Sequence, residues 1–477
     1  MSVRLSLAYM YLSQAFGFVV SFATTVILAR LISPRDFGIF AMAGAFTTVI
    51  NLFVQFGLAK YIVRETELSR DLLRSVFTVN VVMSLVYAGL IVMGGFASIH
   101  LFASPEVGSF LFVFAVFPVI SMMEFLPNAL CYREMRFGVV SFMVMVRTAI
   151  LSGATVLLAY WDYAYLSFAW AQVLASLATA VGFNIIVWRP DAWKLRWDGF
   201  SKIVSFGTQM IGISGASQLS TRGGEMALGS LLGLASLGLY TRASNVPNML
   251  YGSIFLAGSN VIFSRLSHEY RETGQFHATF VHFLRIALAV IWPMLIGLAV
   301  LAQPAIHILY GAKWQEAATP LSLLTIALAV TLSFSVASEI FVLKNETKRQ
   351  VRIEVIRAAV GFLLFVAGAA ISLTLAAAAK VVEALVAFAL YRRPMARLIA
   401  APKGALAAAY GEALILTTAA VLPSFLLMLS TNWSPDTPIL PIIAAVVLGI
   451  ALWIGLLLLR KHPIVVEATR FLNRNKG

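Results

Sequence analysis

The sequence predicts an all-α polytopic membrane protein with 14 transmembrane helices. Three observations support this prediction: 60% of the 477 residues are hydrophobic, only 12% are charged, and long apolar runs follow one another along the chain. Soluble domains carry about 25% charged residues, and a helix needs about 20 mainly apolar residues to cross the hydrocarbon core. The composition therefore excludes a soluble enzyme. We expect the net charge of +14 to orient the helices in the membrane and not to bind nucleic acid.

Fourteen apolar segments reach this length, separated by polar residues or by Gly and Pro breaks. The first follows Arg4 and has no clear small-residue cleavage site, so we interpret it as a spanning helix and not as a removed signal peptide. Only Leu373, Thr374 and Leu375 separate the eleventh segment from the twelfth. In chain order the segments cover residues 9–30, 37–59, 75–102, 107–131, 137–160, 163–188, 203–233, 235–262, 281–303, 318–343, 353–374, 376–391, 412–430 and 438–459.

The basic residues between these segments indicate the orientation. With a cytoplasmic N-terminus, 28 of the 35 lysine and arginine residues fall on the cytoplasmic side, as the positive-inside rule requires. The same rule keeps residues 203–233 together as one helix, because an outside loop at Thr221–Glu225 would move every later basic loop outward. Both termini are therefore predicted to be cytoplasmic.

An internal repeat organises the predicted helices. Shifting the chain by 200 residues places Leu31–Ala43 on Leu231–Ala243 without gaps. We interpret this as two six-helix lobes in the same orientation around a central cavity, although chance similarity of apolar segments is the alternative for one short block. The predicted domains are an N-lobe at 1–200, a C-lobe at 201–400, and two C-terminal helices with a basic tail at 401–477.

The sequence lacks a recognisable enzymatic pattern. It contains no G-x-x-x-x-G-K-[ST] nucleotide loop, and Cys131 is the single cysteine. The loop histidines His268, His277 and His282 do not have the spacing of a metal site. The outward connections are also short. We therefore predict a transporter without a cofactor or a metal site, and its coupling ion, H⁺ or Na⁺, stays open.

Charged residues at membrane depth single out helices seven and eight. Each of Arg222, Glu225 and Arg242 would cost roughly 2.5–3.5 kcal/mol at a helix centre. The two helices turn near Leu234, so Glu225 and Arg242 are expected at similar depth. We predict a Glu225–Arg242 ion pair that faces the cavity, with Arg222 one turn deeper and less compensated. The arginines suit a phosphate or pyrophosphate, Glu225 could carry a proton, and a purely structural pair is the third interpretation.

Neutral polar residues extend this face at three- and four-residue steps. Gln218 and Thr221 lie on helix seven, Asn245 on helix eight, and Gln14 on the matching helix of the first lobe. Hydrogen bonding between helices is the alternative for such residues. The predicted substrate-cavity residues are Arg222, Glu225, Arg242, Gln218, Asn245 and Gln14.

Three further pairs of opposite charge are predicted to be structural. Glu124 and Arg147 lie at comparable distances from their shared loop, and Glu339 and Arg357 have the same relation in the second lobe. Both pairs are near the cytoplasmic face, so each side chain either forms a salt bridge or extends to the membrane surface. Lys380 and Glu383 are three residues apart on one helix and are expected to neutralise each other.

The first 350 residues contain several recognisable motifs: ARLISPRDFGIFAMA at 29–43, FGLAKYIV at 56–63, LPNALCYREMRF at 126–137, SFGTQM at 205–210, LGLYTRASNVPNM at 237–249 and GAKWQEA at 311–317. Together they resemble the polysaccharide-transport branch of the multidrug/oligosaccharidyl-lipid/polysaccharide (MOP) exporter superfamily, which includes Wzx-type flippases. Glu225 departs from the branch, which usually has an aspartate at this position.

The resemblance implies an alternating-access flippase in the bacterial inner membrane. Its cargo would be an undecaprenyl-pyrophosphate-linked oligosaccharide for exopolysaccharide, capsule or O-antigen synthesis, with Arg222 and Arg242 as candidate pyrophosphate contacts. Membrane lipids, a polymerase and a chain-length regulator are the other implied partners. The alternatives are an exporter of drugs or peptidoglycan lipid precursors on the same scaffold, a membrane polysaccharide polymerase or ligase, and a non-transporting scaffold of an assembly complex, which would not explain the charges of the second lobe. A polymerase or ligase would need a larger outer loop than this chain has.

Overall fold

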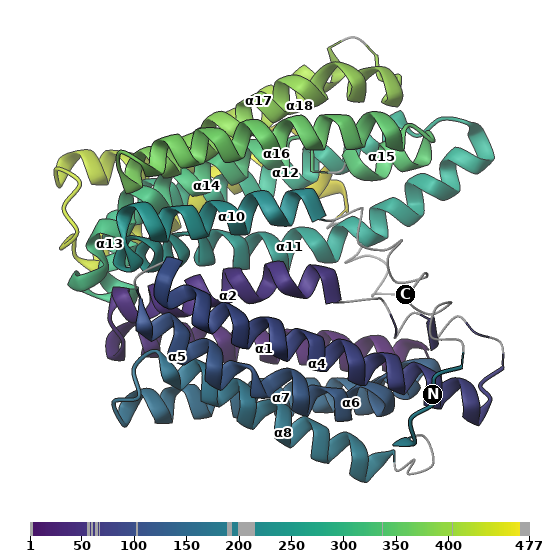
Figure 1. The fold of residues 1–477 in the computed structure, drawn as a ribbon. Helices are drawn as coiled ribbons and strands as arrows, with labels where there is room; N and C mark the ends of the chain where they lie inside the picture. The colour runs from purple at the N-terminus through teal and green to yellow at the C-terminus, as the bar shows by residue number, and fades with distance from the viewer. Residues whose placement is uncertain are drawn as a thin grey trace. The chain divides into compact units, whose positions relative to one another are not determined.

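The computed structural model describes residues 3–54, 67–101, 104–187, 193–198, 215–335, 337–402 and 404–467, together with residues 58, 61, 62 and 65. Every regular element in these ranges is a helix, and the chain divides into two compact units, Met1–Gly238 and Leu239–Gly477 (Figure 1). The predicted lobe borders at residues 200 and 400 were placed from the internal sequence repeat, which is a different criterion from compactness. They therefore stay a prediction. The predicted start of helix seven and the SFGTQM motif lie outside the described residues.

The regular elements described in the first unit are all helices. They are α1 (Val3–Leu31), α2 (Pro34–Val54), α4 (Arg70–Leu101), α5 (Pro105–Phe114), α6 (Val116–Arg133), α7 (Phe137–Tyr160), α8 (Leu166–Ile186) and α10 (Gly215–Leu232).

The second unit continues from the first turn of α11. Its elements are α11 (Leu234–Thr273), α12 (His277–Val300), α13 (Ala302–Tyr310), the 3₁₀ helix η2 (Ala312–Ala317), α14 (Ala318–Leu332), α15 (Ala337–Leu343), α16 (Thr347–Ala369), α17 (Leu373–Ile399), α18 (Ala405–Ser430) and α19 (Ile439–Leu459).

Ten helical segments within the described ranges are long and apolar enough to cross a membrane. They confirm a multi-pass, all-helical membrane protein. They coincide with every predicted segment except the second, seventh, eighth and eleventh, which correspond to α2, α10, α11 and α16. The count of 14 therefore stays a prediction.

Two predicted continuous segments are interrupted. In the fourth, α5 and α6 meet at Ala115, because Pro118 has no N–H for the carbonyl of Phe114. In the tenth, α14 ends at Leu332 and α15 begins at Ala337, and the Ser335 hydroxyl donates to the Leu332 carbonyl oxygen at 3.0 Å. Short polar side chains that bond to the backbone in this way compete with helical hydrogen bonds.

The eleventh and twelfth segments are separate helices, but the turn between them precedes the predicted one. It falls at Ala370–Ser372, and the Ser372 hydroxyl accepts the backbone N–H of Leu375 as an N-cap. A serine N-cap satisfies one of the backbone donors that have no partner within the first turn of a helix. Helix α17 therefore starts at Leu373, inside the stretch that was expected to separate the two helices.

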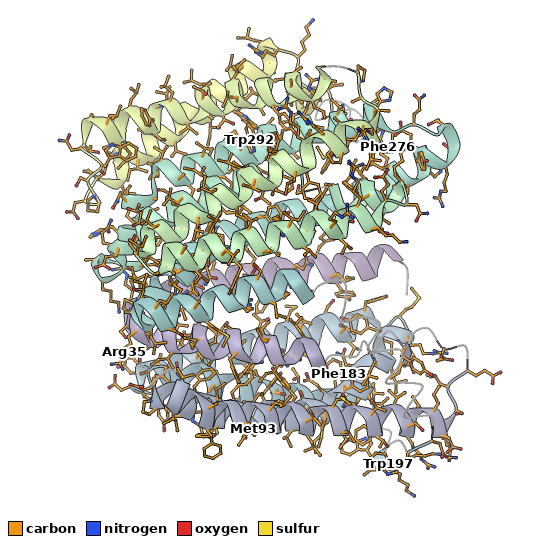
Figure 2. All side chains as sticks on the ribbon, turned by 45° about the horizontal axis from the view of Figure 1, so that its top comes forward. Arg35, Met93, Phe183, Trp197, Phe276 and Trp292 are labelled. Carbon is orange, nitrogen blue, oxygen red and sulfur yellow. The ribbon has the colours of Figure 1, made fainter. Side chains whose placement is uncertain are left out.

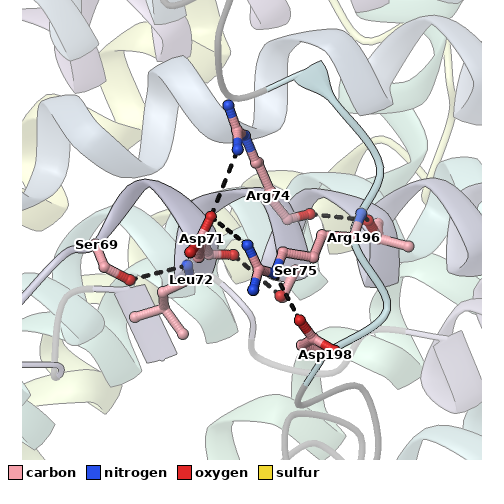
Figure 3. A network of polar contacts seen from close by, with 8 residues as sticks. Ser69, Asp71, Leu72, Arg74, Ser75, Arg196 and Asp198 are labelled. Carbon is pink, nitrogen blue, oxygen red and sulfur yellow. Dashed lines mark hydrogen bonds and ion pairs between the residues drawn. The ribbon is translucent and has the colours of Figure 1, made fainter.

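A polar network fixes residues 193–198 at the start of α4 (Figure 3). The Asp71 carboxylate accepts from Arg74 at 3.5 Å and from Arg196 at 2.5 Å. Arg196 also donates to Asp198 at 2.7 Å, and the Ser69 hydroxyl caps α4 by accepting the N–H of Leu72 at 3.1 Å. The segment that follows α8 is thereby held against α4 within the first unit.

The C-terminal helices α18 and α19 pack on α12 in the second unit. The Trp453 indole N–H donates to the carbonyl oxygen of Ala289 at 2.9 Å, and Arg285 pairs with Glu412 at 2.7 Å. A groove of about 420 Å³ lies among these three helices and is lined almost entirely by apolar side chains, including Met294, Val421 and Ile450. Its lining suits hydrocarbon chains.

Candidate substrate-binding site

Helix α10 carries the first pair of membrane-depth charges. The Arg222 Nη1 atom donates to Glu225 Oε2 at 2.8 Å, and the side chains are 36% and 10% exposed. Residues three apart on a helix lie on one face, so the sequence spacing alone brings these groups together. The result is an ion pair whose carboxylate is buried and whose guanidinium remains partly accessible.

This pair corrects one expectation from the sequence. Arg222 was expected to be less compensated than Arg242, whereas it is bound to Glu225. The predicted Glu225–Arg242 ion pair would join the two compact units and stays a prediction.

Helix α10 carries a polar stripe, formed by Gln218, Thr221, Arg222 and Glu225 on one face, and its residues become more buried along the helix. Gln218 and Thr221 are exposed, Arg222 is half-buried, and Glu225 is buried. At the next step a Cβ atom on Gly229 would lie 2.6 Å from Cε of Met42 in α2, so the two helices approach each other closely at this crossing. The packing of α10 on α2 thus buries the carboxylate end of the stripe and leaves the other end accessible.

Arg242 of α11 lies in an aromatic box. Its guanidinium carbon is 5.8 Å from the ring centroids of both Tyr310 and Trp314, which are themselves 6.1 Å apart, edge to face. Arg242 is 3% exposed, and both aromatic residues are buried. A desolvated cation over an aromatic ring is stabilised by about 2 kcal/mol. The box therefore compensates part of the cost of burying this charge.

The sequence contained a signal for this box that the site prediction missed. Trp314 belongs to the GAKWQEA motif, which was identified without a role. Gly311 begins the motif with φ of 91°, a left-handed conformation that glycine adopts without steric cost. It lets the chain turn between α13 and η2, so that both aromatic rings reach Arg242.

The neutral residues of the predicted site are exposed. Gln14 lies on α1 and Gln218 on α10 in the first unit, and Asn245 lies on α11 in the second unit. The structure thus places Gln218 beside the Arg222–Glu225 pair, one turn away on the same helix, and places Asn245 three residues after Arg242.

Of the three predicted structural pairs, two are confirmed and one is wrong. Arg147 pairs with Glu124 at 3.2 Å, and Lys380 pairs with Glu383 at 2.8 Å. Arg357 does not pair with Glu339. Its partners are Glu354 at 2.7 Å and Glu383 at 3.2 Å.

Arg357 therefore belongs to a network between α16 and α17. The network contains two cations and two carboxylates, and the Tyr391 hydroxyl donates to Glu354 Oε1 at 2.6 Å. Sequence reasoning missed it because Glu354 and Glu383 are far apart in the chain and meet only when α16 packs on α17. Within the described parts of the chain, no group of three or more His, Cys, Asp or Glu side chains could hold a metal ion.

Solved structures share this fold. A structure of the lipid II flippase MurJ in an inward closed conformation superposes with a TM-score of 0.78 at 14% identity, covering 96% of this chain and all of MurJ. An inward-facing multidrug resistance MATE family transporter of the MOP superfamily gives a TM-score of 0.61 at 16% identity, over 80% of this chain and 95% of the transporter. The class is therefore that of helical, multi-pass membrane proteins with the MOP fold.

The family follows from the sequence profile of the polysaccharide biosynthesis proteins, which matches residues 27–319. The chain belongs to this family, which confirms the resemblance drawn from its motifs. The succinoglycan biosynthesis transport protein ExoT of Rhizobium meliloti (strain 1021) is 23% identical over 330 residues, 68% of this chain and 66% of ExoT. The lipopolysaccharide biosynthesis protein WzxC of Escherichia coli (strain K12) is 22% identical over 309 residues, 63% of this chain and 61% of WzxC. Each alignment spans less than two thirds of the relative's own length.

Proposed function

We propose that this protein is a flippase for an undecaprenyl-pyrophosphate-linked oligosaccharide. It works by alternating access, moves its cargo from the cytoplasmic to the outer leaflet of a bacterial inner membrane, and supplies a pathway for exopolysaccharide, capsule or O-antigen. Family membership and the names of ExoT and WzxC support a role in polysaccharide transport. The MurJ-like fold is compatible with a lipid-linked cargo, and the apolar groove is compatible with membrane lipids.

The main support for a pyrophosphate-linked cargo is the partly accessible guanidinium of Arg222 beside the buried Glu225. Guanidinium groups bind phosphate oxygens in pairs, and a pyrophosphate presents several such oxygens. Arg242, which its aromatic box fixes in place, adds positive potential, and Gln218, Asn245 and Gln14 provide neutral hydrogen-bonding groups for the sugar end. Exposed polar side chains at membrane depth are stable where water or a polar ligand covers them.

The proposal includes the predicted topology. It comprises 14 helices, two lobes at 1–200 and 201–400, the appended helices of 401–477, and cytoplasmic termini. The loop charges support it, and so does a reciprocal contact of two glycines 200 residues apart, Gly38 and Gly238. A polymerase and a chain-length regulator of the same pathway are the proposed protein partners, and the flippase itself needs no catalytic residues.

Deletion of the gene tests this proposal in a host that retains its polymerase. Lipid-linked oligosaccharide should accumulate in the cytoplasmic leaflet, where it is protected from reagents added outside, and the wild-type gene should reverse this. If deletion left the intermediate accessible from outside at its normal level, flipping would be the wrong function.

Arginine variants test the site. Arg222→Gln and Arg242→Gln should abolish export while the protein remains in the membrane at normal abundance. The matched control is Arg349→Gln, which removes a charge from a pair that is 40% and 38% exposed. Normal export by both site variants would rule out their role.

A further inference from the structure

In the proposed topology, the cytoplasmic ends of α16 and α17 carry exposed cations that the substrate-binding site does not use. We propose that these cations, called the basic rim, bind the phosphate headgroup of an anionic phospholipid of the cytoplasmic leaflet. The proposal rests on the proposed topology and does not depend on the cargo. The basic rim consists of Lys348, Arg352, Arg392, Arg393 and Arg397, all in the second unit.

The cations of the basic rim have no carboxylate partner among the described residues, and all five side chains are exposed. The two carboxylates at this end of α16 are already paired. Glu346 lies 3.3 Å from Arg349, and Glu354 lies 2.7 Å from Arg357. The N–H groups of the rim therefore remain available to an anion from outside the chain.

Orientation of the helices in the membrane does not account for unpaired cations. The positive-inside rule depends on the sign of the loop charge, and not on whether each side chain has a partner. At the same predicted face of the first unit, Arg74, Arg136 and Arg196 lie 3.5, 3.7 and 2.5 Å from a carboxylate. The chain thus pairs these three arginines internally and leaves the five cations of the basic rim without such a pair.

The basic rim lies at the depth of lipid headgroups. The turn at Ala370–Ser372 joins α16 to α17 and is on the outer side in the proposed topology. Measured along each helix at 1.5 Å per residue, the α16 cations are roughly 26–32 Å from this turn, and the α17 cations roughly 28–36 Å. The hydrocarbon core is about 30 Å thick, and the bilayer with its headgroups about 40–45 Å. Long Lys and Arg side chains at this depth can reach the phosphate layer.

On each of the two helices, an exposed apolar stripe leads to these cations. On α16, Arg352 is followed at three- and four-residue steps by Val355 and Leu363, which are 50% and 67% exposed. On α17, Leu385 is 52% exposed and precedes Arg392 by two such steps. Residues at these steps share one face of a helix. Each stripe therefore has the order of a phospholipid molecule, with an apolar length that ends in groups for a phosphate.

Exposed apolar residues alone do not define this site. Met93 of α4 is 66% exposed (Figure 2). At the cytoplasmic end of α4, however, Arg74 pairs with Asp71. The combination of an exposed apolar stripe with unpaired cations therefore distinguishes α16 and α17 from α4.

An anionic phospholipid matches both parts of this surface. A guanidinium group binds phosphate oxygens through paired hydrogen bonds, and the acyl chains would lie along the apolar stripes. Each Lys or Arg near the membrane surface strengthens the attraction to anionic lipid roughly fivefold. A free phosphate ion would use the cations but not the stripes. The bound lipid would hold this end of α16 and α17 at the headgroup layer.

Fluorescence quenching in vesicles tests the proposal. The full chain with Cys131→Ala and Ala396→Cys would carry a fluorophore at residue 396, an exposed position between Arg393 and Arg397. The vesicles are made of phosphatidylcholine and contain a small fraction of either phosphatidylglycerol or phosphatidylcholine with a nitroxide quencher on its acyl chain. The ratio of the two quenching efficiencies measures the lipid preference beside the rim. Phosphatidylglycerol should be preferred by at least about fivefold.

Charge variants identify the groups responsible for this preference. Arg397→Gln and Arg352→Gln should each lower it about fivefold, whereas Arg397→Lys should retain it, because the positive charge attracts the lipid. The matched control Lys194→Gln removes an exposed charge from the same predicted face of the first unit and should behave as the wild type. An excess of inorganic phosphate at constant ionic strength should not displace the lipid.

Three results would overturn the lipid site. The first is a wild type without a preference for phosphatidylglycerol, or one whose preference survives in both glutamine variants. The second is an equal loss in Lys194→Gln, which would assign the preference to diffuse surface charge. The third is displacement by inorganic phosphate, which would assign the basic rim to a free anion. The vesicles contain no cargo, so a failure of the flippase function would leave this test unaffected.

Discussion

A Cβ atom on Gly238 would lie 1.8 Å from the carbonyl oxygen of Pro34, so the first turn of α11 meets the first turn of α2 backbone to backbone. The contact is reciprocal, because a Cβ atom on Gly38 would lie 1.6 Å from the carbonyl oxygen of Leu234. Gly38 and Gly238 are 200 positions apart, and so are Pro34 and Leu234. This separation equals the shift of the sequence repeat. Two segments related by a twofold axis would produce this reciprocity.

Alanine at these glycines should therefore destabilise the protein. The added methyl group meets backbone and not the end of a flexible side chain, and such overpacking costs about 1–3 kcal/mol. We expect Gly38→Ala and Gly238→Ala to lower the melting temperature in detergent and to reduce export. The matched control on α2 is Gly44→Ala, since a Cβ atom there meets nothing within 4 Å. Equal melting of all three variants would contradict the contact.

Trp314 should be energetically coupled to Arg242. Replacement of either residue removes the same cation–π contact, so the losses in Trp314→Leu and Arg242→Gln should not add. We expect a coupling free energy of about 0.5–2 kcal/mol in a double-mutant cycle on melting. A cycle of Trp314→Leu with Arg349→Gln should be additive, and additivity in both cycles would refute the aromatic box.

Neutralising Glu383 should destabilise the second unit. Glu383→Gln leaves Lys380 without its carboxylate partner and weakens the compensation of Arg357, and breaking such a buried pair costs about 3–5 kcal/mol. The partial exposure of both cations places the expected loss at the lower end of this range. Lys380→Met in the same chain should restore part of the stability, because Arg357 then balances Glu354. Glu346→Gln should change stability by less than about 1 kcal/mol. The prediction fails if Glu383→Gln melts like Glu346→Gln.

His462 should make the attachment of the C-terminal helices sensitive to acid. It follows α19, is 1% exposed, and its Nε2 atom lies 3.9 Å from Glu412, which also binds Arg285. Burial lowers the pKa of His462, Glu412 opposes this, and the positive charges of Arg285 and His282 add to the lowering.

The direction of this pH dependence follows from proton uptake by the unfolded chain. Below the unfolded pKa of about 6.5, the unfolded chain binds a proton that the folded protein does not. Stability should therefore fall as the pH drops through this range, by at most about 1.4 kcal/mol per pH unit, until the lowered folded pKa is reached. Melting curves from about pH 7.5 to about pH 5.5 should show a smaller loss for His462→Gln than for the wild type. Identical losses in the two proteins would contradict the prediction.

Much of the fold and part of the site could be predicted from the sequence. The predicted Lys380–Glu383 pair is three residues apart on one helix, so helical geometry alone brings its side chains together. Arg222 and Glu225 have the same spacing, but their contact was not predicted, because Glu225 was assigned to Arg242. The predicted Glu124–Arg147 pair joins two consecutive helices, where depth could be counted from a shared loop. The same count of residues from a shared loop predicted a Glu339–Arg357 pair that does not form. Two residues at equal depth can lie on different faces of their helices.

The sequence by itself determined that this chain is a multi-pass helical membrane protein of the polysaccharide biosynthesis family. Hydropathy, loop charge and motifs are properties of consecutive residues and need no knowledge of which helices touch. Only the tertiary structure decided that Tyr310 and Trp314 enclose Arg242 and that Glu383 neutralises Arg357. The physical reason is that these partners are chosen by the rotation and packing of helices far apart in the chain, which local sequence does not encode.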